Sequence, residues 1–463
     1  MAISPQVALS DKTLARGEQP LEQKPQDALP AATPQDSEAL KAAAPIPAIL
    51  PTATIELCLF APTIEFVAIT GDFTRWQDLP MARDKEGNWR VSVELPDGEF
   101  AYRFKVASKS WFYKKGEIVT ITDPKATRVD PDTGNGVLRI RNGRVCVDEY
   151  VWKHDDAPLP ANNELVIYEL HVADFSGGEA DIYQRGQFKH VTEKLDYLQD
   201  LGVNCLELMP VKEYPGDYAW GYTPQYLFAP ESAYGKSEDL KHLIDEAHAR
   251  GMRVILDGVY NHAHTDTPLA QIDHDYWFHH DPKDKNMSWG PQYNYEHWDP
   301  DNKVMPARKF ISESIHFWVS QYHVDGLRFD AAKQIENFDA LRMMRDTGCP
   351  VAGNKPYISI AEYLPESAEV AGPPDSGKPM DAVWQDSYYW TIGDQAIAQG
   401  HPDLERIKDV VHPMRRGFTD CTQVVNYCSN HDHLRLMPQL AQSLVFDEFA
   451  FARAKLAATM VFT

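Results

Sequence analysis

The chain has few cysteines for its 463 residues, and they are not arranged as metal or disulfide sites require. The six cysteines are scattered, and no Cys-x-x-Cys or Cys-x-x-His spacing occurs. The sequence therefore predicts neither a zinc centre nor a disulfide framework. There is also no long apolar run of membrane-span length and no apolar stretch behind Met1 of the signal-peptide kind. We therefore expect a cytoplasmic protein.

Basic residues are also scarce relative to acidic ones. The sequence has 45 Lys and Arg against 68 Asp and Glu, a net charge of −23. Such a balance disfavours non-specific binding to nucleic acid or to an anionic membrane and suits a protein that acts on neutral ligands. With 43% hydrophobic and 11% aromatic residues, the chain can bury a large core. No protein partner is inferred from it.

Amino-acid composition and hydrophobic patterning divide the first part of the chain into three segments. Residues 1–51 are rich in Ala, Pro, Gln and Glu with almost no aromatic side chains, which predicts a disordered tail. Residues 52–145 form short alternating apolar and polar runs separated by turn residues, which predicts a small β-sandwich. Residues 146–164 are expected to be a linker.

From residue 165 to residue 463, apolar strands alternate with amphipathic helices. The expected helices are residues 191–201, 240–250 and 310–322, and the expected strands are residues 166–171, 203–208, 253–257, 324–330, 357–361, 381–384 and 423–427. This alternation predicts an α/β fold with a parallel sheet, namely a (β/α)8 TIM barrel. The long irregular segment over about residues 258–305 is expected to be an inserted, functional loop subdomain.

The end of the chain complicates the barrel. Residues 449–458 have a helical pattern, and residues 459–463 are expected to begin the eighth strand. The barrel is therefore expected to be truncated at this strand. An open barrel leaves unpaired backbone groups on its edge strands, so we expect marginal stability for the chain alone.

One strand leads directly into an acid. Residues 324–330 read Val-Asp-Gly-Leu-Arg-Phe-Asp. Alternate residues of a strand share a face, so Arg328 and Asp330 point the same way, and the guanidinium favours the ionised carboxylate. Two interpretations are open at this point: a catalytic nucleophile at the carboxyl end of a barrel strand, or a structural Arg–Asp pair.

Polar clusters follow four of the expected strands. Because the carboxyl ends of parallel barrel strands meet on one rim, the side chains of these clusters should converge. Three carboxylates in one cleft repel one another, and this cost in free energy is usually accepted only where they have a catalytic role. Retaining glycoside cleavage requires at least two carboxyl groups. The clusters contain Asp257, Asn261 and His262; Arg328 and Asp330; Glu362; and Asn430, His431 and Asp432.

These clusters resemble the signature regions of a known family. Residues 257–262, 326–333, 360–362 and 430–432 are similar to the four signature regions of the α-amylase superfamily, glycoside hydrolase family thirteen. The resemblance extends over nearly all of residues 54–463. It implies an amylase-type barrel in which Asp330 is the nucleophile, Glu362 the general acid/base and Asp432 the third acid, which binds sugar hydroxyls.

The same resemblance implies further substrate contacts and a question about metal. Tyr222 would stack beneath the sugar at the cleaved bond, and Lys333 would bind the leaving chain. In calcium-dependent amylases the residue at Asn261 is a calcium ligand; relatives of the branching type usually lack the ion, so no cofactor is expected. The implied substrate-binding residues are Tyr222, Asp257, His262, Arg328, Lys333 and His431.

The front module carries a resemblance of its own. Residues 71–76, 87–89, 102–104 and 123–124 are similar to the N-terminal carbohydrate-binding module of branching enzymes, isoamylases and trehalohydrolases. Aromatic faces suit the apolar faces of sugars, so its tryptophans either stack on glucose rings or fill the sandwich core. These tryptophans are Trp76, Trp89 and Trp111.

The motifs leave the subfamily open. The resemblance implies a retaining enzyme that cleaves α-1,4 bonds in glycogen-like or starch-like glucans or in maltooligosaccharides. A branching transferase or a trehalohydrolase is the alternative; branching enzymes typically have a second acid after the catalytic Glu, where this sequence has Tyr363. A non-catalytic glucan-binding protein is the second alternative, because an unclosed barrel would hold the triad poorly.

Overall fold

The computed structural model describes residues 52–177, 185–216, 219–285, 287–372 and 377–462. The expected tail over residues 1–51 lies outside the described residues. Within these ranges, no helix combines the length and the apolarity that crossing a bilayer would need.

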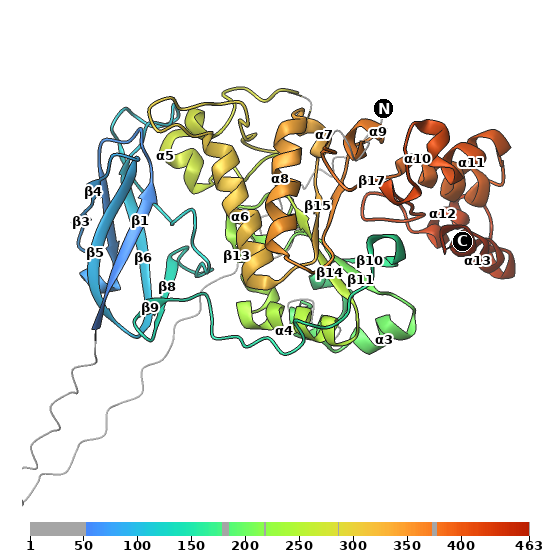
Figure 1. The fold of residues 1–463 in the computed structure, drawn as a ribbon, viewed down its shortest axis with the longest axis horizontal. Coiled ribbons are helices and arrows are strands. Elements are labelled where there is room, and N and C mark those ends of the chain that lie inside the picture. The colour runs from blue at the N-terminus through green and yellow to red at the C-terminus, as the bar shows by residue number, and fades with distance from the viewer. Residues whose placement is uncertain (1–51, 178–184, 217–218, 286, 373–376, 463) are drawn as a thin grey trace, which may run out of the picture. The chain divides into compact units, whose positions relative to one another are not determined.

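The first β-rich region consists of two antiparallel sheets, as the sequence predicts (Figure 1). One sheet has the order β1-β5-β4, and the other has the order β3-β2-β6-β8-β9 with β7 paired to β6. Their bounds are β1 Thr52–Phe60, β2 Val67–Gly71, β3 Leu79–Pro80, β4 Ala82–Arg83, β5 Asn88–Pro96, β6 Gly98–Ala107, β7 Ile118–Ile121, β8 Gly136–Arg141 and β9 Arg144–Val145.

Alternation of side chains explains this packing. Along β1, Ile55, Leu57 and Leu59 are buried while their neighbours are exposed, as a two-residue period requires. Trp89 lies in this core and donates from Nε1 to the carbonyl oxygen of Ala61 at 3.0 Å. Trp89 is therefore a core residue.

The other two tryptophans singled out in this region are on its surface. Trp76 is 43% exposed and donates from Nε1 to Asp72 Oδ1 at 3.1 Å. Trp111 is 61% exposed and lies edge-on to Phe112, with ring centroids 5.3 Å apart. The exposed ring faces of both side chains can meet a ligand from solution.

The second region contains a seven-stranded parallel sheet with the strands in sequence order, as in a TIM barrel. Neighbouring strands pair in register, for example Glu169 with Glu207 and Arg328 with Ile360. The strands are β10 Ile167–Leu170, β11 Cys205–Leu208, β14 Arg253–Gly258, β15 Gly326–Phe329, β16 Ile358–Ala361, β17 Ala382–Trp384 and β18 Val424–Val425. A separate two-stranded sheet pairs β12 Lys212–Glu213 with β13 Tyr226–Pro230.

The parallel strands are apolar because both of their faces are covered. Every residue of β11, β14, β15 and β16 is buried. The helices follow as α1 Val172–Phe175, α2 Phe188–Thr192, α3 Leu195–Asp200, α4 Ser237–Ala249, α5 Pro268–Trp277, α6 Pro306–Tyr322, α7 Ala332–Ile335, α8 Phe338–Val351, α9 Ala368–Ala371, α10 Asp386–Tyr388, α11 Leu404–Val411, α12 Leu436–Gln442 and α13 Asp447–Phe462.

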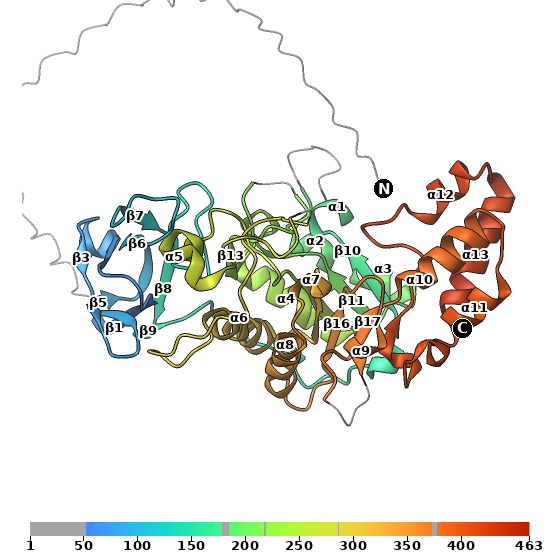
Figure 2. The same cartoon turned by 90° about the horizontal axis from the view of Figure 1, so that it is seen from above.

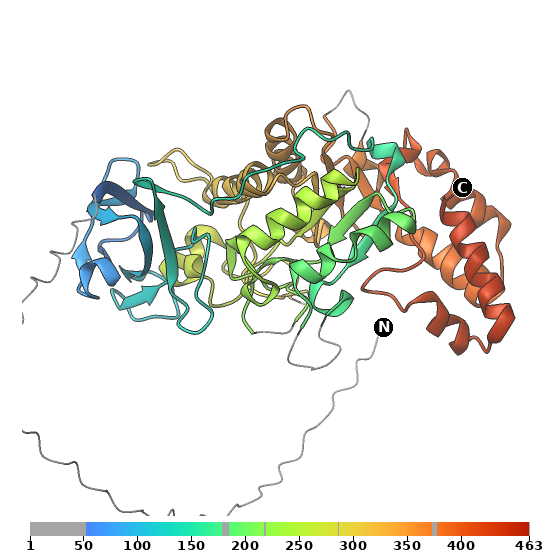
Figure 3. The same cartoon turned by 90° about the horizontal axis from the view of Figure 1, so that it is seen from below.

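Local signals set the ends of the long covering helices. The helix α6 begins with Pro306, which suits a first turn because proline lacks the N–H that would be unpaired there. Asn337 caps α8 by accepting from the backbone N–H of Ala340 at 2.9 Å. Figure 2 shows α6 and α8 side by side, and Figure 3 shows the sheet from below.

The helix expected over residues 191–201 is divided in two. The structure has α2 and α3 instead, separated at Glu193 and Lys194, and Lys194 has non-helical angles. Near the break, Thr192 Oγ1 donates to the carbonyl oxygen of Phe188 at 3.1 Å. A threonine that bonds back to its own helix favours bending at this point.

The expected eighth strand is wrong. Residues 459–462 belong to α13, and residue 463 lies outside the described residues. The preceding alanines favour helix, and Thr459 Oγ1 donates one turn back to the carbonyl oxygen of Lys455 at 2.9 Å. The helices α10–α13 gather beside β17 (Figure 1) around their own core. This core contains Tyr388, Ile392, Ile397, Ala398, Val410, Leu440, Ala450 and Ala457.

The segment at residues 258–305 contains α5 and isolated β-bridges, and it contacts the β-rich region. Ser108 Oγ donates to the carbonyl oxygen of Gln271 at 2.7 Å. The backbone N–H of Lys109 donates to the carbonyl oxygen of Ile272 at 2.9 Å. These bonds anchor the segment that leads to one wall of the cavity described below.

Candidate active site

The centre of the site is a guanidinium surrounded by carboxylates. Arg328, on β15, is fully buried, and its Nη1 donates to both oxygens of Asp257 at 2.9 and 2.7 Å and to Asp330 Oδ1 at 3.1 Å. Its Nη2 lies 3.1 Å from Glu362 Oε2, close but poorly aligned for a hydrogen bond. The strand ends β14, β15 and β16 thus bring three acids around one arginine.

Asp330 and Glu362 have different surroundings. Glu362 Oε2 accepts the N–H of Ala331 at 2.7 Å, whereas Asp330 depends on Arg328 for its stabilising contact. Burial raises the pKa of Asp330; the charge of Arg328 opposes this shift, and the charges of Glu362 and Asp257 add to it. The sequence pattern predicted an ionised Asp330. In the structure, the pKa of Asp330 is raised instead, so its ionised form is disfavoured. Burial and the neighbouring acids therefore favour the protonated form of Asp330.

Tyr222 and His262 form the opposite side of the site. Tyr222 donates from its hydroxyl to Asp257 Oδ2 at 2.7 Å. His262 Nε2 donates to the backbone oxygen of Tyr222 at 2.8 Å, and its Nδ1 accepts from Asn261 Nδ2 at 3.3 Å. Burial lowers the pKa of His262 to about 4, so its imidazole is neutral. The sugar hydrogen bond expected of His262 would have to replace one of these contacts.

His431 and Asp432 lie in the segment that follows β18. The rings of His431 and Tyr222 are stacked, with centroids 5.0 Å apart and an interplanar angle of 21°. His431 Nε2 lies 3.5 Å from Asp432 Oδ1, and the Asp432 side chain is 46% exposed. The N–H of Asp432 donates to Asn430 Oδ1 at 3.1 Å, which fixes the start of this turn.

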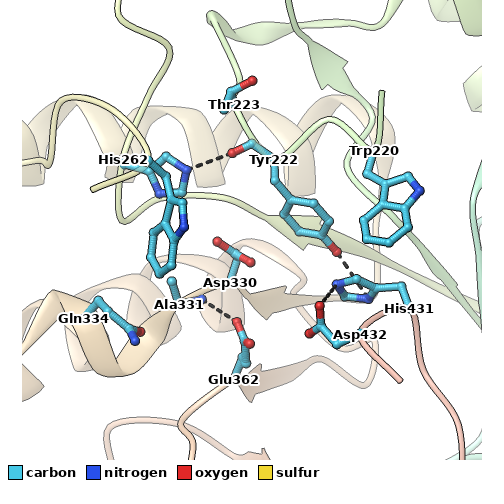
Figure 4. Close-up of a pocket in the computed structure, with 11 residues that line it drawn as sticks. Trp220, Tyr222, Thr223, His262, Asp330, Ala331, Gln334, Glu362, His431 and Asp432 are labelled. Atoms are coloured by element: carbon cyan, nitrogen blue, oxygen red, sulfur yellow. Dashed lines mark hydrogen bonds and ion pairs between the residues drawn. The ribbon is translucent and has the colours of Figure 1, made fainter. Parts of the chain in front are cut away.

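These side chains enclose a cavity of about 270 Å³. In Figure 4, the carboxyls of Asp330, Glu362 and Asp432 point into the same space, and the ring of Tyr222 lies across it. The lining residues are Trp220, Tyr222, Thr223, His262, Trp289, Asp330, Ala331, Gln334, Glu362, His431 and Asp432.

Some expected site residues lie behind the cavity wall. Asp257 and Arg328 hold the carboxyls and Tyr222 from beneath without lining the cavity. Lys333 is at the start of α7, where its Nζ donates to the carbonyl oxygen of Leu364 at 2.7 Å, and it is not a lining residue either. The expected contact between Lys333 and a leaving chain thus needs a movement of its side chain.

Trp289 and Gln334 are among the lining residues that were not expected from the sequence. Trp289 is 46% exposed, and its ring centroid is 5.4 Å from that of His262. Gln334 belongs to α7, beside Asp330. The aromatic content of the long segment at residues 258–305 was the available signal for Trp289; Gln334 had none, because it is an ordinary helix residue in the sequence.

The surroundings of Asn261 do not suit calcium. Its Oδ1 accepts from Gln292 Nε2 at 3.2 Å, and its Nδ2 donates to His262. Calcium needs six to eight oxygen ligands, several of them carboxylates. In the described part of the chain, no three His, Cys, Asp or Glu side chains come together as a metal site would require.

Comparison with known proteins finds matches to two families. Residues 166–372 match the family "Alpha amylase, catalytic domain", and residues 47–126 match "Carbohydrate-binding module 48 (Isoamylase N-terminal domain)". A malto-oligosyltrehalose trehalohydrolase of Saccharolobus solfataricus is 29% identical over 76% of this chain and 62% of its own length. A 1,4-alpha-glucan branching enzyme GlgB of Nitrosomonas eutropha is 31% identical over 66% of this chain and 42% of its own length. The chain thus spans less than two thirds of these relatives.

Solved structures show the same fold. A type I pullulanase of Bacillus subtilis, crystallised with maltose, superposes with a TM-score of 0.73 at 23% identity, covering 89% of this chain and 63% of the pullulanase. A putative alpha amylase of Salmonella typhimurium superposes with a TM-score of 0.60 at 25% identity, covering 79% of this chain and 57% of that protein. Residues 166–372 thus match the α-amylase catalytic domain and residues 47–126 match carbohydrate-binding module 48, which confirms the two resemblances found in the sequence.

Proposed function

We propose that the chain is a retaining enzyme acting on α-1,4-glucans or maltooligosaccharides. The observation that carries the proposal is the arrangement of Asp330 and Glu362, which face one cavity and share one buried arginine, Arg328. Neighbouring carboxyls on two strand ends are what a covalent displacement with acid/base assistance needs. The catalytic roles of Asp330, Glu362 and Asp432 are part of this proposal.

The reaction proceeds in two displacements. Asp330 attacks the anomeric carbon while Glu362 gives its proton to the glycosidic oxygen, so one glucan leaves as an alcohol and the other is esterified to Asp330. Glu362 then takes a proton from water or from a glucan hydroxyl, and that oxygen displaces Asp330. This mechanism requires a proton on Glu362 and an ionised Asp330 when substrate is bound. Arg328 stabilises the negative charge that Asp330 then carries.

The cavity walls suit a neutral sugar. Tyr222 and Trp289 offer aromatic surface, and His431 and Asp432 offer hydrogen-bonding groups at its rim. Trp76 and Trp111 are exposed on the β-rich region, and the proposed glucan-binding module over residues 52–145 would use them. The neighbouring residues 146–164 are proposed to link this module to the barrel over residues 165–463.

One experiment separates the alternatives. The protein is incubated with amylose while iodine staining and reducing ends are followed, and with a maltooligosyl-trehalose while free trehalose is followed. Hydrolysis raises reducing ends. Branching, which the GlgB relatives favour, shifts the stain while reducing ends stay nearly flat. Trehalose release favours the function that the Saccharolobus relative is named for. No change in any readout would refute the proposal and favour a non-catalytic glucan-binding protein.

A further inference from the structure

A glutamate of the first barrel strand holds the turn that follows the last one. Glu169, on β10, accepts the backbone N–H of His431 at Oε2, 3.0 Å away, and its Oε1 lies 2.8 Å from His431 Nδ1. The two residues are 262 positions apart in the sequence. The strands β10 and β18 are the two ends of the sheet order and are not paired to each other. Glu169 therefore bridges the open side of the sheet next to the proposed third acid.

His431 lies between two carboxylates. Its Nδ1 faces Glu169, and its Nε2 faces Asp432 Oδ1 at 3.5 Å. An ionised carboxylate accepts hydrogen bonds and has none to donate, so the ring needs a proton on each nitrogen to satisfy both neighbours. This requirement describes an imidazolium, which is the opposite of the neutral His262 on the far side of the cavity.

The other groups around His431 leave this charge in place. The Tyr222 hydroxyl is 3.4 Å from Nδ1, and the rings of Trp220 and Trp384 pack at centroid distances of 5.6 and 6.0 Å. Burial and the positive charge of Arg328 lower the pKa of His431, but the hydrogen bond and charge of Glu169, together with Asp432, raise it overall.

Glu207 is a second carboxyl beside Glu169. The two glutamates are register partners on β10 and β11, and Glu207 is 2% exposed. Within the described residues, its buried Oε1 has no hydrogen-bond partner. Burial raises the pKa of Glu207 far above its ordinary range, and the charge of Glu169 adds to the shift. The burial of Glu207 thus favours its protonated form, whereas Glu169 accepts the backbone N–H of His431 and faces its ring Nδ1.

We propose that Glu169 is a positioning residue of the active site, which fixes the turn carrying Asp432 and keeps His431 as an imidazolium. The part of this inference that concerns catalysis rests on the proposed function. The part that concerns charge does not, because the protonation of His431 can be read without any substrate.

The first experiment measures the charge of His431. The titration of its ring Cε1–H is followed by NMR in the parent protein, with the signal assigned by its loss in His431→Asn. The parent should titrate above the ordinary pKa of about 6.5 for histidine. Glu169→Gln, which keeps the shape and removes the charge, should lower this pKa by about 1 unit or more. Its register partner provides the control: Glu207→Gln replaces a neutral acid by a neutral amide and should leave His431 titrating above the ordinary value.

A His431 that titrates below about 6.5 in the parent would overturn the proposal. So would a Glu207→Gln variant with the same effect as Glu169→Gln, because the negative charge would then not be specific to Glu169. If Glu169→Gln fails to fold, which circular dichroism would show, the parent titration still decides whether His431 is an imidazolium, and Glu169→Asp, which keeps the charge, should titrate as the parent does.

The second experiment uses activity on amylose. Glu169→Gln should lower kcat by about 100-fold, the effect of displacing a catalytic group slightly, and should move the alkaline limb of its pH profile to lower pH. Glu169→Asp keeps the charge and should retain that limb at its parent position. A kcat loss with an unmoved pH profile in Glu169→Gln would show a merely structural role and contradict the proposal. An inactive parent whose His431 still titrates high would refute the proposed function and leave the charge assignment standing.

Discussion

Arg328 donates from a single nitrogen, Nη1, to both carboxyl oxygens of Asp257, at 2.9 and 2.7 Å, and neither side chain is open to solvent. The same nitrogen reaches Asp330 at 3.1 Å. Arg328 therefore interacts mainly with Asp257, through two hydrogen bonds, and makes a single, longer hydrogen bond to Asp330. Burial is the main reason why the proposed nucleophile keeps a raised pKa although an arginine lies beside it, and the sharing of Arg328 with Asp257 limits how far the arginine opposes this shift.

Arg328→Leu should destabilise the fold strongly. Removing one partner leaves buried carboxylates without compensation, which costs about 3–5 kcal/mol of unfolding free energy. The measurement is urea-induced unfolding followed by circular dichroism. Arg406→Leu is the control, because Arg406 lies on the surface in α11 and pairs with the half-exposed Asp403; its effect should stay within about 0.5 kcal/mol. Equal effects of the two substitutions would contradict the description of Arg328 as the centre of the site.

Asp330→Asn should separate activity from stability. Without the nucleophile, kcat should fall by roughly 10⁴-fold or more while glucan binding persists. Binding is measured by calorimetry with a maltooligosaccharide. A variant within a few-fold of the parent activity would eliminate Asp330 as the nucleophile.

The same variant should change how stability depends on pH. The folded-state pKa of Asp330 is raised, so the folded protein binds this proton more tightly than the unfolded chain. The stabilisation is present in full below the unfolded pKa of about 3.9 and is lost as pH rises toward the folded pKa. Asp330→Asn lacks this loss, so its Tm should exceed that of the parent by a margin that grows from about pH 4 upward. A margin that is constant or shrinks with pH would show that Asp330 is not destabilised by its burial.

Trp289→Ala should weaken substrate binding more than turnover. Trp289 forms one wall of the cavity and, among the described residues, has no hydrogen bond to the carboxyls, so under the proposed function it would contribute aromatic contact with the sugar. A contact of about 0.5–1.5 kcal/mol corresponds to a roughly 2- to 10-fold rise in KM. Trp298→Ala is the matched control, since Trp298 is similarly exposed but does not line the cavity. If both substitutions raise KM equally, Trp289 has no specific role at the site.

The segment containing α10–α13 should unfold before the barrel strands. It has its own small core, and many of its large apolar side chains are exposed, including Phe449, Phe451 and Leu456 on α13. Few buried contacts imply a low local opening free energy. Hydrogen exchange followed by mass spectrometry should show faster exchange in α11–α13 than in β11–β16. Equal protection of the two sets of elements would contradict this order of unfolding. A single sharp thermal transition above about 60 °C would contradict the marginal stability expected from the sequence.

Strand ends could be predicted from the sequence because their signal is local. An apolar run that ends in a charged residue marks a parallel strand and its rim, and this pattern alone places Asp257, Asp330 and Glu362 on neighbouring strand ends. The bounds of the observed strands differ from the predicted ones by only a few residues. The conformation of residues 459–462 was harder to predict, because a short β-branched and aromatic run forms a strand or extends a helix according to its neighbours.

The sequence by itself determined the repeated β/α pattern, the two-sheet module and the acids that follow the strands. These features depend on side-chain periodicity and on the rule that parallel strands end on the same rim. Only the tertiary structure decided which groups share the charge of Arg328, that Trp289 lines the cavity, and that Glu169 reaches His431 from 262 residues away. Proton placement and contacts across the open side of the sheet depend on burial and on distances between segments remote in the chain, and no local pattern encodes them.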